Sequence, residues 1–295
     1  MDLEKLQVMK DARGFIAALD QSGGSSAKTL SAYGIAPESY STEEEMFDLI
    51  HEMRKRVFTS SVFNNNHIVG AILFYKTMMG KVEDEFTADY LWNKKHIVSF
   101  LKVDKGLEEE NNGVKLMKEI PDLDEQLAEA NSKNIFGTKM RSVIYSANEE
   151  GIAAIVDQQF AFAKRICDAG LVPIIEPEVD INAADKAECE TILKQKIEEK
   201  LVTWNENDLI MFKFTIPSEA NKYLSLYDNK AVVKIVALSG GYDLDTACDL
   251  LSKNTNMIAS FSRALLGGLT AQQSQEDFDA TLDATITKIY NASID

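Results

Sequence analysis

One lysine in a predominantly apolar stretch has the clearest chemical implication of any residue in this sequence. Lys213 lies within the run 209–216, LIMFKFTI. Burial disfavours the charged form of an amine, and neighbouring cations such as Lys102 and Lys139 disfavour it further. A neutral amine can attack a carbonyl carbon, whereas an ammonium group cannot. A structural alternative is a lysine whose stem crosses apolar surface to reach water, but the nearby cations favour a nucleophile.

Two further pairs of charged residues are each spaced two positions apart. Lys139 and Arg141 form one pair, and Glu176 and Glu178 form the other. Alternate side chains of a strand point to the same face, so each pair shares a face. The two glutamates could supply the proton transfers that imine formation requires. Their alternative role is charge balance for the lysines, as in a structural ion pair.

Small polar turns in the sequence could bind an anion. Residues 239–241 (SGG) offer backbone N–H groups, and Arg263 offers a planar set of donors. Asp20 closes the first apolar run, and the segment 21–25 (QSGGS) follows it. A turn of this kind alone is weak evidence for a phosphate site, but its position directly after a predicted strand strengthens that evidence.

These polar residues fall at or near the ends of short apolar runs. The eight runs are Phe15–Leu19, Ile68–Phe74, Ile97–Val103, Ile135–Val143, Leu171–Pro177, Leu209–Phe214, Val232–Leu238 and Met257–Phe261. Short, continuously apolar runs are typical of parallel strands that are covered on both faces.

Helical patterns separate the runs. Residues 41–44 read as a capping box, a second helix ends at Gly170 as its C-cap, and 185–201 and 277–290 continue the pattern. Residues 75–96 are less regular and are left unassigned. Alternating strands and helices predict an α/β fold, a single (β/α)8 TIM barrel over residues 1–295, with its chemistry at the carboxyl ends of the strands. An open doubly wound sheet is the alternative.

The composition restricts the class of protein and its partners. The chain has 295 residues and a net charge of −16, which disfavours nucleic acid and anionic membranes as partners. No apolar segment is long enough to span a membrane, and no secretory signal is apparent. Three isolated cysteines suggest neither disulfides nor a zinc site. We therefore expect a cytoplasmic protein without a disulfide framework or a zinc knuckle; a homo-oligomer is possible.

At these residues the sequence resembles the class I fructose-bisphosphate aldolases, in particular the short bacterial type. The motifs occur in the family's order from residue 15 to residue 265: FIAALDQSGGS (15–25), FLKVDKG (100–106), IFGTKMRS (135–142), LVPIIEPEV (171–179), MFKFTIP (211–217), VALSGG (236–241) and ASFSRAL (259–265).

The resemblance implies a metal-independent lyase of glycolysis that cleaves fructose 1,6-bisphosphate reversibly to dihydroxyacetone phosphate and glyceraldehyde 3-phosphate. It implies no cofactor, because a covalent imine on the family's lysine, here Lys213, accepts the electron pair released by carbon–carbon cleavage. The implied catalytic residues are Lys213, Glu176, Asp20, Lys139 and Glu178. The implied substrate-binding residues are Lys102, Arg141, Ser239, Gly240, Arg263, Ser22 and Ser25.

The sequence departs from the family's pattern in two places. Longer members end in a tyrosine that moves the enamine proton, whereas Tyr290 is the nearest candidate here and lies on a helical pattern that suggests packing. Ser262 stands where many relatives have glycine before the arginine. The residue that protonates the enamine is therefore left unassigned.

Three other functions are compatible with parts of the sequence. A zinc-dependent aldolase needs converging histidine or carboxylate ligands, but His51 lies on a predicted helix and His67 and His96 precede their strands. A Schiff-base lyase for another phosphorylated sugar, such as tagatose 1,6-bisphosphate, remains open. A scaffold or binding protein would predict no covalent chemistry at Lys213.

Overall fold

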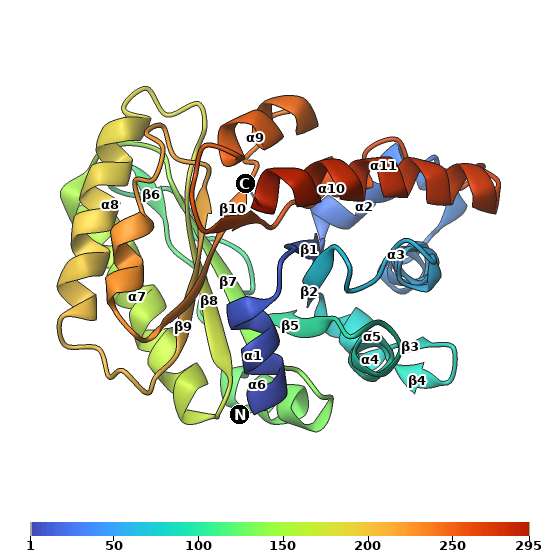
Figure 1. The fold of residues 1–295 in the computed structure, drawn as a ribbon, viewed down its shortest axis with the longest axis horizontal. Helices are drawn as coiled ribbons and strands as arrows, with labels where there is room; N and C mark the ends of the chain where they lie inside the picture. Colours follow the sequence, from blue (N-terminus) through green and yellow to red (C-terminus); the bar gives the residue numbers. More distant parts are fainter. Residues whose placement is uncertain (1, 295) are drawn as a thin grey trace.

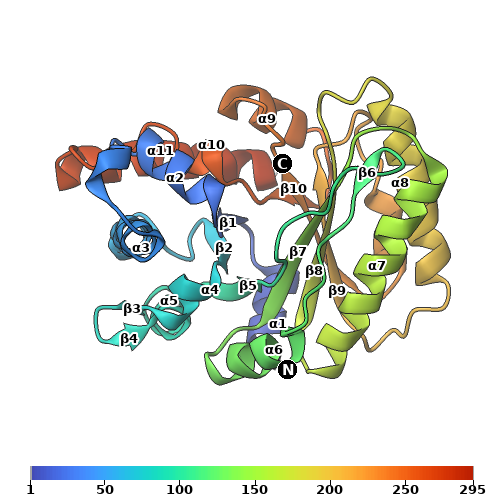
Figure 2. The same cartoon turned by 180° about the vertical axis from the view of Figure 1, so that it is seen from behind.

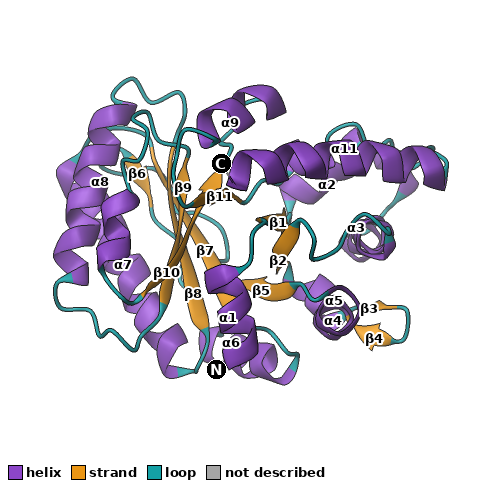
Figure 3. Ribbon diagram, viewed as in Figure 1, coloured by secondary structure: helices purple, strands orange, loops and turns teal. Residues whose placement is uncertain are grey.

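The computed structural model describes residues 2–294, in which eight parallel strands form one sheet that curves into a barrel (Figures 1 and 3). Their order is β1-β2-β5-β7-β8-β9-β10-β11. The bounds are β1 (Phe15–Leu19), β2 (Ile68–Leu73), β5 (Val98–Lys102), β7 (Gly137–Ile144), β8 (Val172–Val179), β9 (Ile210–Thr215), β10 (Val232–Leu238) and β11 (Met257–Ala259). A hydrogen bond of 3.1 Å from the Ala18 amide to the Phe261 carbonyl returns the chain after β11 to β1. The predicted barrel is confirmed, and the open sheet is wrong.

Helices surround the barrel, with α7 and α8 on one side and α3, α4 and α5 on the other (Figures 1 and 2). The α-helices are α1 (Leu3–Asp11), α2 (Gly24–Ala32), α3 (Glu43–Thr59), α4 (Tyr75–Met79), α5 (Thr87–Lys95), α6 (Leu123–Ser132), α7 (Glu149–Asp168), α8 (Lys186–Leu201), α9 (Leu244–Leu251), α10 (Arg263–Leu266) and α11 (Gln275–Ile294). Two 3₁₀ turns, η1 (Pro37–Ser39) and η2 (Leu224–Asp228), complete the helical elements.

Three short strands lie outside the main path. β3 (Lys81–Val82) and β4 (Glu85–Phe86) form an antiparallel hairpin, and β6 (Val114–Lys115) pairs antiparallel with β7. The hairpin, with α4 and α5, fills the segment 75–96 whose structure could not be predicted. Its elements are too short to give a periodic apolar pattern.

Each of the eight apolar runs overlaps a barrel strand, and the predicted ends differ from the observed ends by up to two residues. The capping box is real, but its predicted register at 41–44 is wrong by one residue. Thr42 is the N-cap of α3, and its hydroxyl accepts a 3.1 Å hydrogen bond from the amide of Glu45. This start turns Met46 and Ile50 towards the core, and burial of that face fixes the register.

Apolar side chains fill both faces of the sheet. Ile16 and Ala18 belong to the cluster inside the barrel, whereas Phe15, Ala17 and Leu19 belong to the larger cluster between the strands and the helices. This double burial explains why the strands are apolar at every position. Met9 of α1 joins the inner cluster, so α1 closes the amino end of the barrel and leaves the carboxyl end for the site.

No helix within residues 2–294 combines the length and the apolar character that crossing a bilayer would require.

Candidate active site

One cavity of about 750 Å³ opens at the carboxyl ends of the strands, and every residue implied by the sequence lines it. The twelve residues lie on or just after seven of the eight barrel strands: Asp20, Ser22, Ser25, Lys102, Lys139, Arg141, Glu176, Glu178, Lys213, Ser239, Gly240 and Arg263. Parallel strands bring these segments together because their carboxyl ends meet at one edge of the barrel.

The pleat of β9 directs Lys213 into this cavity. Phe212 and Phe214, its neighbours in sequence, point to the outer face and stack on each other with ring centroids 5.5 Å apart. The alternation of a strand therefore places the lysine inward, where its residue is only 4% exposed. The aromatic pair anchors the strand on both sides of the amine.

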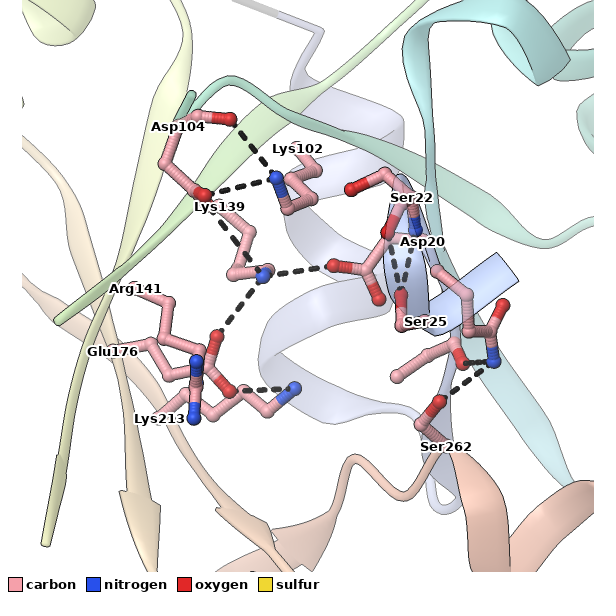
Figure 4. Close-up of polar contacts among 12 residues, drawn as sticks. Asp20, Ser22, Ser25, Lys102, Asp104, Lys139, Arg141, Glu176, Lys213 and Ser262 are labelled. Carbon is pink, nitrogen blue, oxygen red and sulfur yellow. Dashed lines mark hydrogen bonds and ion pairs between the residues drawn. The ribbon is translucent and has the colours of Figure 1, made fainter. Parts of the chain in front are cut away.

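Glu176 lies between two lysines at the centre of the site (Figure 4). Its Oε1 is 3.1 Å from the Nζ of Lys213, and its Oε2 is 3.0 Å from the Nζ of Lys139. Lys139 also lies 2.8 Å from Oδ2 of Asp20 and 3.9 Å from Oδ2 of Asp104. A continuous polar path thus runs from Lys213 through Glu176 and Lys139 to Asp20.

The charges at this centre reinforce one another. Burial alone would raise the pKa of Asp20, but the positive charges of Lys139 and Lys213 outweigh it and hold that pKa well below its usual range. Burial alone would lower the pKa of Lys139, but the carboxylates of Asp20 and Glu176 raise it well above its usual range. The two carboxylates thus favour the ammonium form of Lys139, which suits it less well than Lys213 to act as a nucleophile.

Two further ion pairs flank the centre. Arg141 Nε lies 2.6 Å from Oε2 of Glu178, and the charge and hydrogen bond of this glutamate overcome burial to raise the pKa of Arg141 above its usual range. Lys102 Nζ lies 2.8 Å from Oδ1 of Asp104. Glu178 thus balances Arg141 directly and makes no ion pair with either central lysine within the part of the chain that the structure describes.

The turn after β10 contains two glycines with positive φ. Gly240 and Gly241 have φ values of 62° and 119°, in the region that favours glycine. A Cβ at Gly240 would lie 2.6 Å from Cγ2 of Ile181, so a side chain would strain the turn. On the other side of the cavity, the hydroxyl of Ser25 donates a 2.7 Å hydrogen bond to the carbonyl of Ser22.

Comparison with known proteins identifies the family. The model of fructose-bisphosphate aldolase class I matches residues 4–216. A protein from Porphyromonas gingivalis named fructose-bisphosphate aldolase class 1 is 53% identical over 294 residues, covering the full length of both chains. The chain belongs to the class I fructose-bisphosphate aldolase family.

Solved structures agree with the barrel of this aldolase. A fructose-bisphosphate aldolase from Plasmodium falciparum, solved with TRAP and a small-molecule inhibitor, superposes with a TM-score of 0.78. It is 18% identical, and the match covers 98% of this chain and 92% of that one. A protein from Corynebacterium glutamicum gives a TM-score of 0.53 at 11% identity, covering 99% and 92% of the two chains. These likenesses concern the fold.

Residues that bear on the rival functions lie away from the cavity. His51 is on α3, and His67 and His96 precede β2 and β5 at the amino end of the barrel. Residues 2–294 contain no group of three histidine, cysteine, aspartate or glutamate side chains suited to a metal ion. Tyr290, on α11, packs edge-on against His67 with centroids 4.6 Å apart, so the interpretation of Tyr290 as a packing residue is confirmed.

The cavity also contains residues to which the sequence analysis assigned no role. Asp104 contacts both Lys102 and Lys139, and its position two residues after Lys102 was the available signal. Lys28, on α2, and Ser260, after β11, also line the cavity. Lys28 lies outside the predicted strands, and Ser260 lies within the run Met257–Phe261 without a charged residue beside it, so no spacing pointed to them.

Proposed function

We propose that this cavity is where the chain, a class I fructose-bisphosphate aldolase, cleaves fructose 1,6-bisphosphate through an imine on Lys213. The observation that carries the proposal is the path from Lys213 through Glu176 and Lys139 to Asp20. Such a path places a nucleophile, a proton donor and a proton acceptor within reach of one sugar.

In the forward direction, the neutral amine of Lys213 attacks the ketone carbon of the open-chain sugar. Glu176, which takes a proton from the ammonium of Lys213 when the neutral amine forms, gives this proton to the departing hydroxyl; water leaves, and a protonated imine remains. Asp20 then accepts the proton of the hydroxyl on carbon four as the bond between carbons three and four breaks. The electron pair of that bond moves into the imine, giving an enamine and releasing glyceraldehyde 3-phosphate.

The enamine is next protonated at carbon three, and water hydrolyses the resulting imine to release dihydroxyacetone phosphate and free Lys213. Lys139 keeps its positive charge throughout, because at every step Asp20 or Glu176 is an ionised carboxylate beside it. Its charge stabilises ionised Asp20 before the proton transfer. The protonated imine serves as the electron sink that a metal ion supplies in other aldolases.

Two groups of donors are proposed to hold the phosphates. Ser239, Gly240 and Arg263 would bind the phosphate of the ketone half, and Ser22 and Ser25 would lie near the other. Six cationic side chains and four carboxylates line the cavity, so its walls favour an anion although the whole chain carries −16. Lys102 and Arg141 contribute to this local excess.

We further propose a single catalytic domain that acts in the cytoplasm. Its partner is a phosphorylated sugar rather than nucleic acid or a membrane.

Trapping the imine tests the proposal. Borohydride added with dihydroxyacetone phosphate should reduce the imine to a permanent adduct, detected by intact mass and assigned to Lys213 by peptide mapping. Lys213→Ala should fold, form no adduct and lose cleavage. Glu176→Gln should lower kcat by about 10²–10⁴-fold, the usual contribution of a general acid. An adduct on Lys139 instead of Lys213, or none on the wild-type chain, would refute the assignment.

Removal of metal ions provides a second test. Because the imine is proposed as the only electron sink, kcat should be unchanged after dialysis against a strong chelator. Activity that disappears and returns with zinc would contradict this mechanism. The matched control is a zinc-dependent enzyme dialysed in parallel, which confirms that the chelator removed the metal.

A further inference from the structure

A buried arginine outside the cavity has no role in the mechanism above. Arg54, on α3, is 0% exposed. Its Nη1 donates to the hydroxyl of Thr77 at 2.7 Å, and its Nη2 donates to the main-chain carbonyl and the side-chain Oε1 of Gln21 at 2.7 and 2.9 Å. No aspartate or glutamate between residues 2 and 294 forms an ion pair with it, and its Nε has no hydrogen-bond partner there.

A buried guanidinium without a carboxylate costs folding free energy. Burial lowers the pKa of Arg54 to about 9, although the charge of nearby Asp20 opposes the shift. A neutral side chain of similar volume would fill this space without the penalty. The presence of a cation therefore calls for a reason beyond packing, and its contacts with Gln21 point to one.

Gln21 connects two functional turns. It directly follows Asp20, and its side-chain Nε2 donates a 2.7 Å hydrogen bond to the hydroxyl of Ser262, the residue before Arg263. Ser262 lies at the edge of the site in Figure 4. Arg54 holds the other end of the same amide and the carbonyl of the same residue. One guanidinium thus fixes Gln21 through its main chain and its side chain together.

This connection crosses the seam of the barrel. β11 has only three residues and is joined to β1 by the hydrogen bond from Ala18 to the carbonyl of Phe261. Asp20, the proposed proton acceptor, and Arg263, which is proposed to donate hydrogen bonds to a substrate phosphate, lie on opposite sides of this seam. Cleavage requires both to meet one substrate at once, and displacements of about 1 Å can lower a rate by about 100-fold.

We propose that Arg54 is a positioning residue for carbon–carbon cleavage: by fixing Gln21, it holds the turns of Asp20 and Arg263 in register across the β1–β11 seam. The inference rests on the proposed function, since it assumes the roles of those two residues. Formation of the imine on Lys213 does not require Asp20, so loss of Arg54 should affect cleavage more than imine formation.

The experiment compares Arg54→Met, Gln21→Met and the double variant with the wild-type chain. We expect each single variant to lower kcat for fructose 1,6-bisphosphate cleavage by about 10–100-fold, the scale of a small misplacement. The adduct trapped on Lys213 with saturating dihydroxyacetone phosphate and borohydride should stay near the wild-type level. Because the two residues act as one unit, the double variant should be no worse than the poorer single variant. Arg54→Lys keeps the charge but loses the planar set of donors, so it should behave like Arg54→Met.

Lys5→Met is the matched control for removing a buried cation. Lys5, on α1, is 2% exposed and donates a 2.8 Å hydrogen bond to the carbonyl of Asn134, far from the cavity at the amino end of the barrel. This variant should lower Tm and leave kcat unchanged.

Three results would overturn the role of Arg54. They are a kcat within twofold of wild type in Arg54→Met, additive losses in the double variant, or a parallel loss of trapping and cleavage that follows Tm. If Arg54→Met does not fold, Gln21→Met tests the inference alone, and a kcat equal to that of the wild-type chain in this variant overturns it. If no adduct is trapped on Lys213 of the wild-type chain, the proposed function is overturned as well. If the adduct forms but the variants keep the wild-type kcat, only the role of Arg54 is overturned.

Discussion

Glu176 contacts two lysines through its two oxygens, at 3.1 Å from Lys213 and 3.0 Å from Lys139. Charge balance and proton transfer were alternative roles for this residue, but one carboxylate in this position can perform both. While it balances Lys139 through one oxygen, its other oxygen faces the amine that is proposed to react. Glu178 differs, because its carboxylate binds Arg141.

At the residue scale, the ion pair of Asp20 gives a testable dependence of stability on pH. The native pKa of Asp20 is lowered, so the unfolded chain binds a proton at this residue more readily than the native one. The stabilisation is therefore complete above the unfolded pKa of about 3.9 and is lost as the pH falls through the native pKa. The difference in unfolding free energy between wild type and Asp20→Asn should shrink as the pH falls from about 5 towards 3.

Denaturant unfolding of both chains at several pH values measures this difference, and titrating groups that do not interact with Asp20 cancel in the comparison. A difference that is constant over this range would show that the native pKa of Asp20 is not lowered. A difference that grows towards acid pH would reverse the predicted sign.

At the scale of elements, the strands act as fixed supports for the site. The pleat sends Lys213 inward between two outward phenylalanines, and the parallel pairing of β7 with β8 sets Lys139 beside Ile174 and Arg141 beside Glu176. The close approach of these two strands begins at Gly137. A Cβ at this residue would lie 2.1 Å from the carbonyl oxygen of Val172 and 2.9 Å from the ring of Phe100.

Gly137→Ala should therefore separate β7 from β8 at the amino end of the pair. We expect a loss of about 1–3 kcal/mol in unfolding free energy, the usual cost of overpacking a core. Thermal and denaturant unfolding measure it. Gly24→Ala is the control for stability, since nothing lies within 4 Å of a Cβ there. Equal stability of the two variants would mean that the backbone shifts freely at Gly137.

At the scale of the whole molecule, the two tryptophans report on different sides of the barrel. Trp92, on α5, packs against the inner cluster, and Trp204, after α8, packs edge-on against Phe160. If the chain is one catalytic domain, both sides should unfold together. Trp204→Phe leaves only Trp92, and Trp92→Phe leaves only Trp204.

Fluorescence of each single-tryptophan chain should give the same denaturant midpoint as its own far-UV circular dichroism, as expected for cooperative unfolding. Comparing each chain with its own circular dichroism removes the direct effect of the substitution. Two separated midpoints within one chain would divide the barrel into independently unfolding parts.

The sequence by itself determined the barrel and most of the proposed site. Eight apolar runs, seven of them with polar residues near the carboxyl end, predict parallel strands and their reactive edge, because strand geometry is local and repeats every two residues. The period of two also places Lys139 with Arg141 and Glu176 with Glu178 on shared faces. The ordered motifs of the resemblance then assigned the residues to roles.

Only the tertiary structure decided which of these residues touch. The curvature of the sheet brings Asp20 to Lys139 although the two are far apart in sequence, and it turns Lys28 of α2 towards the cavity. The contact of Arg54 with Gln21 depends on how α3 packs against the end of β1. Such contacts depend on packing between elements, which the local pattern of a single segment does not contain.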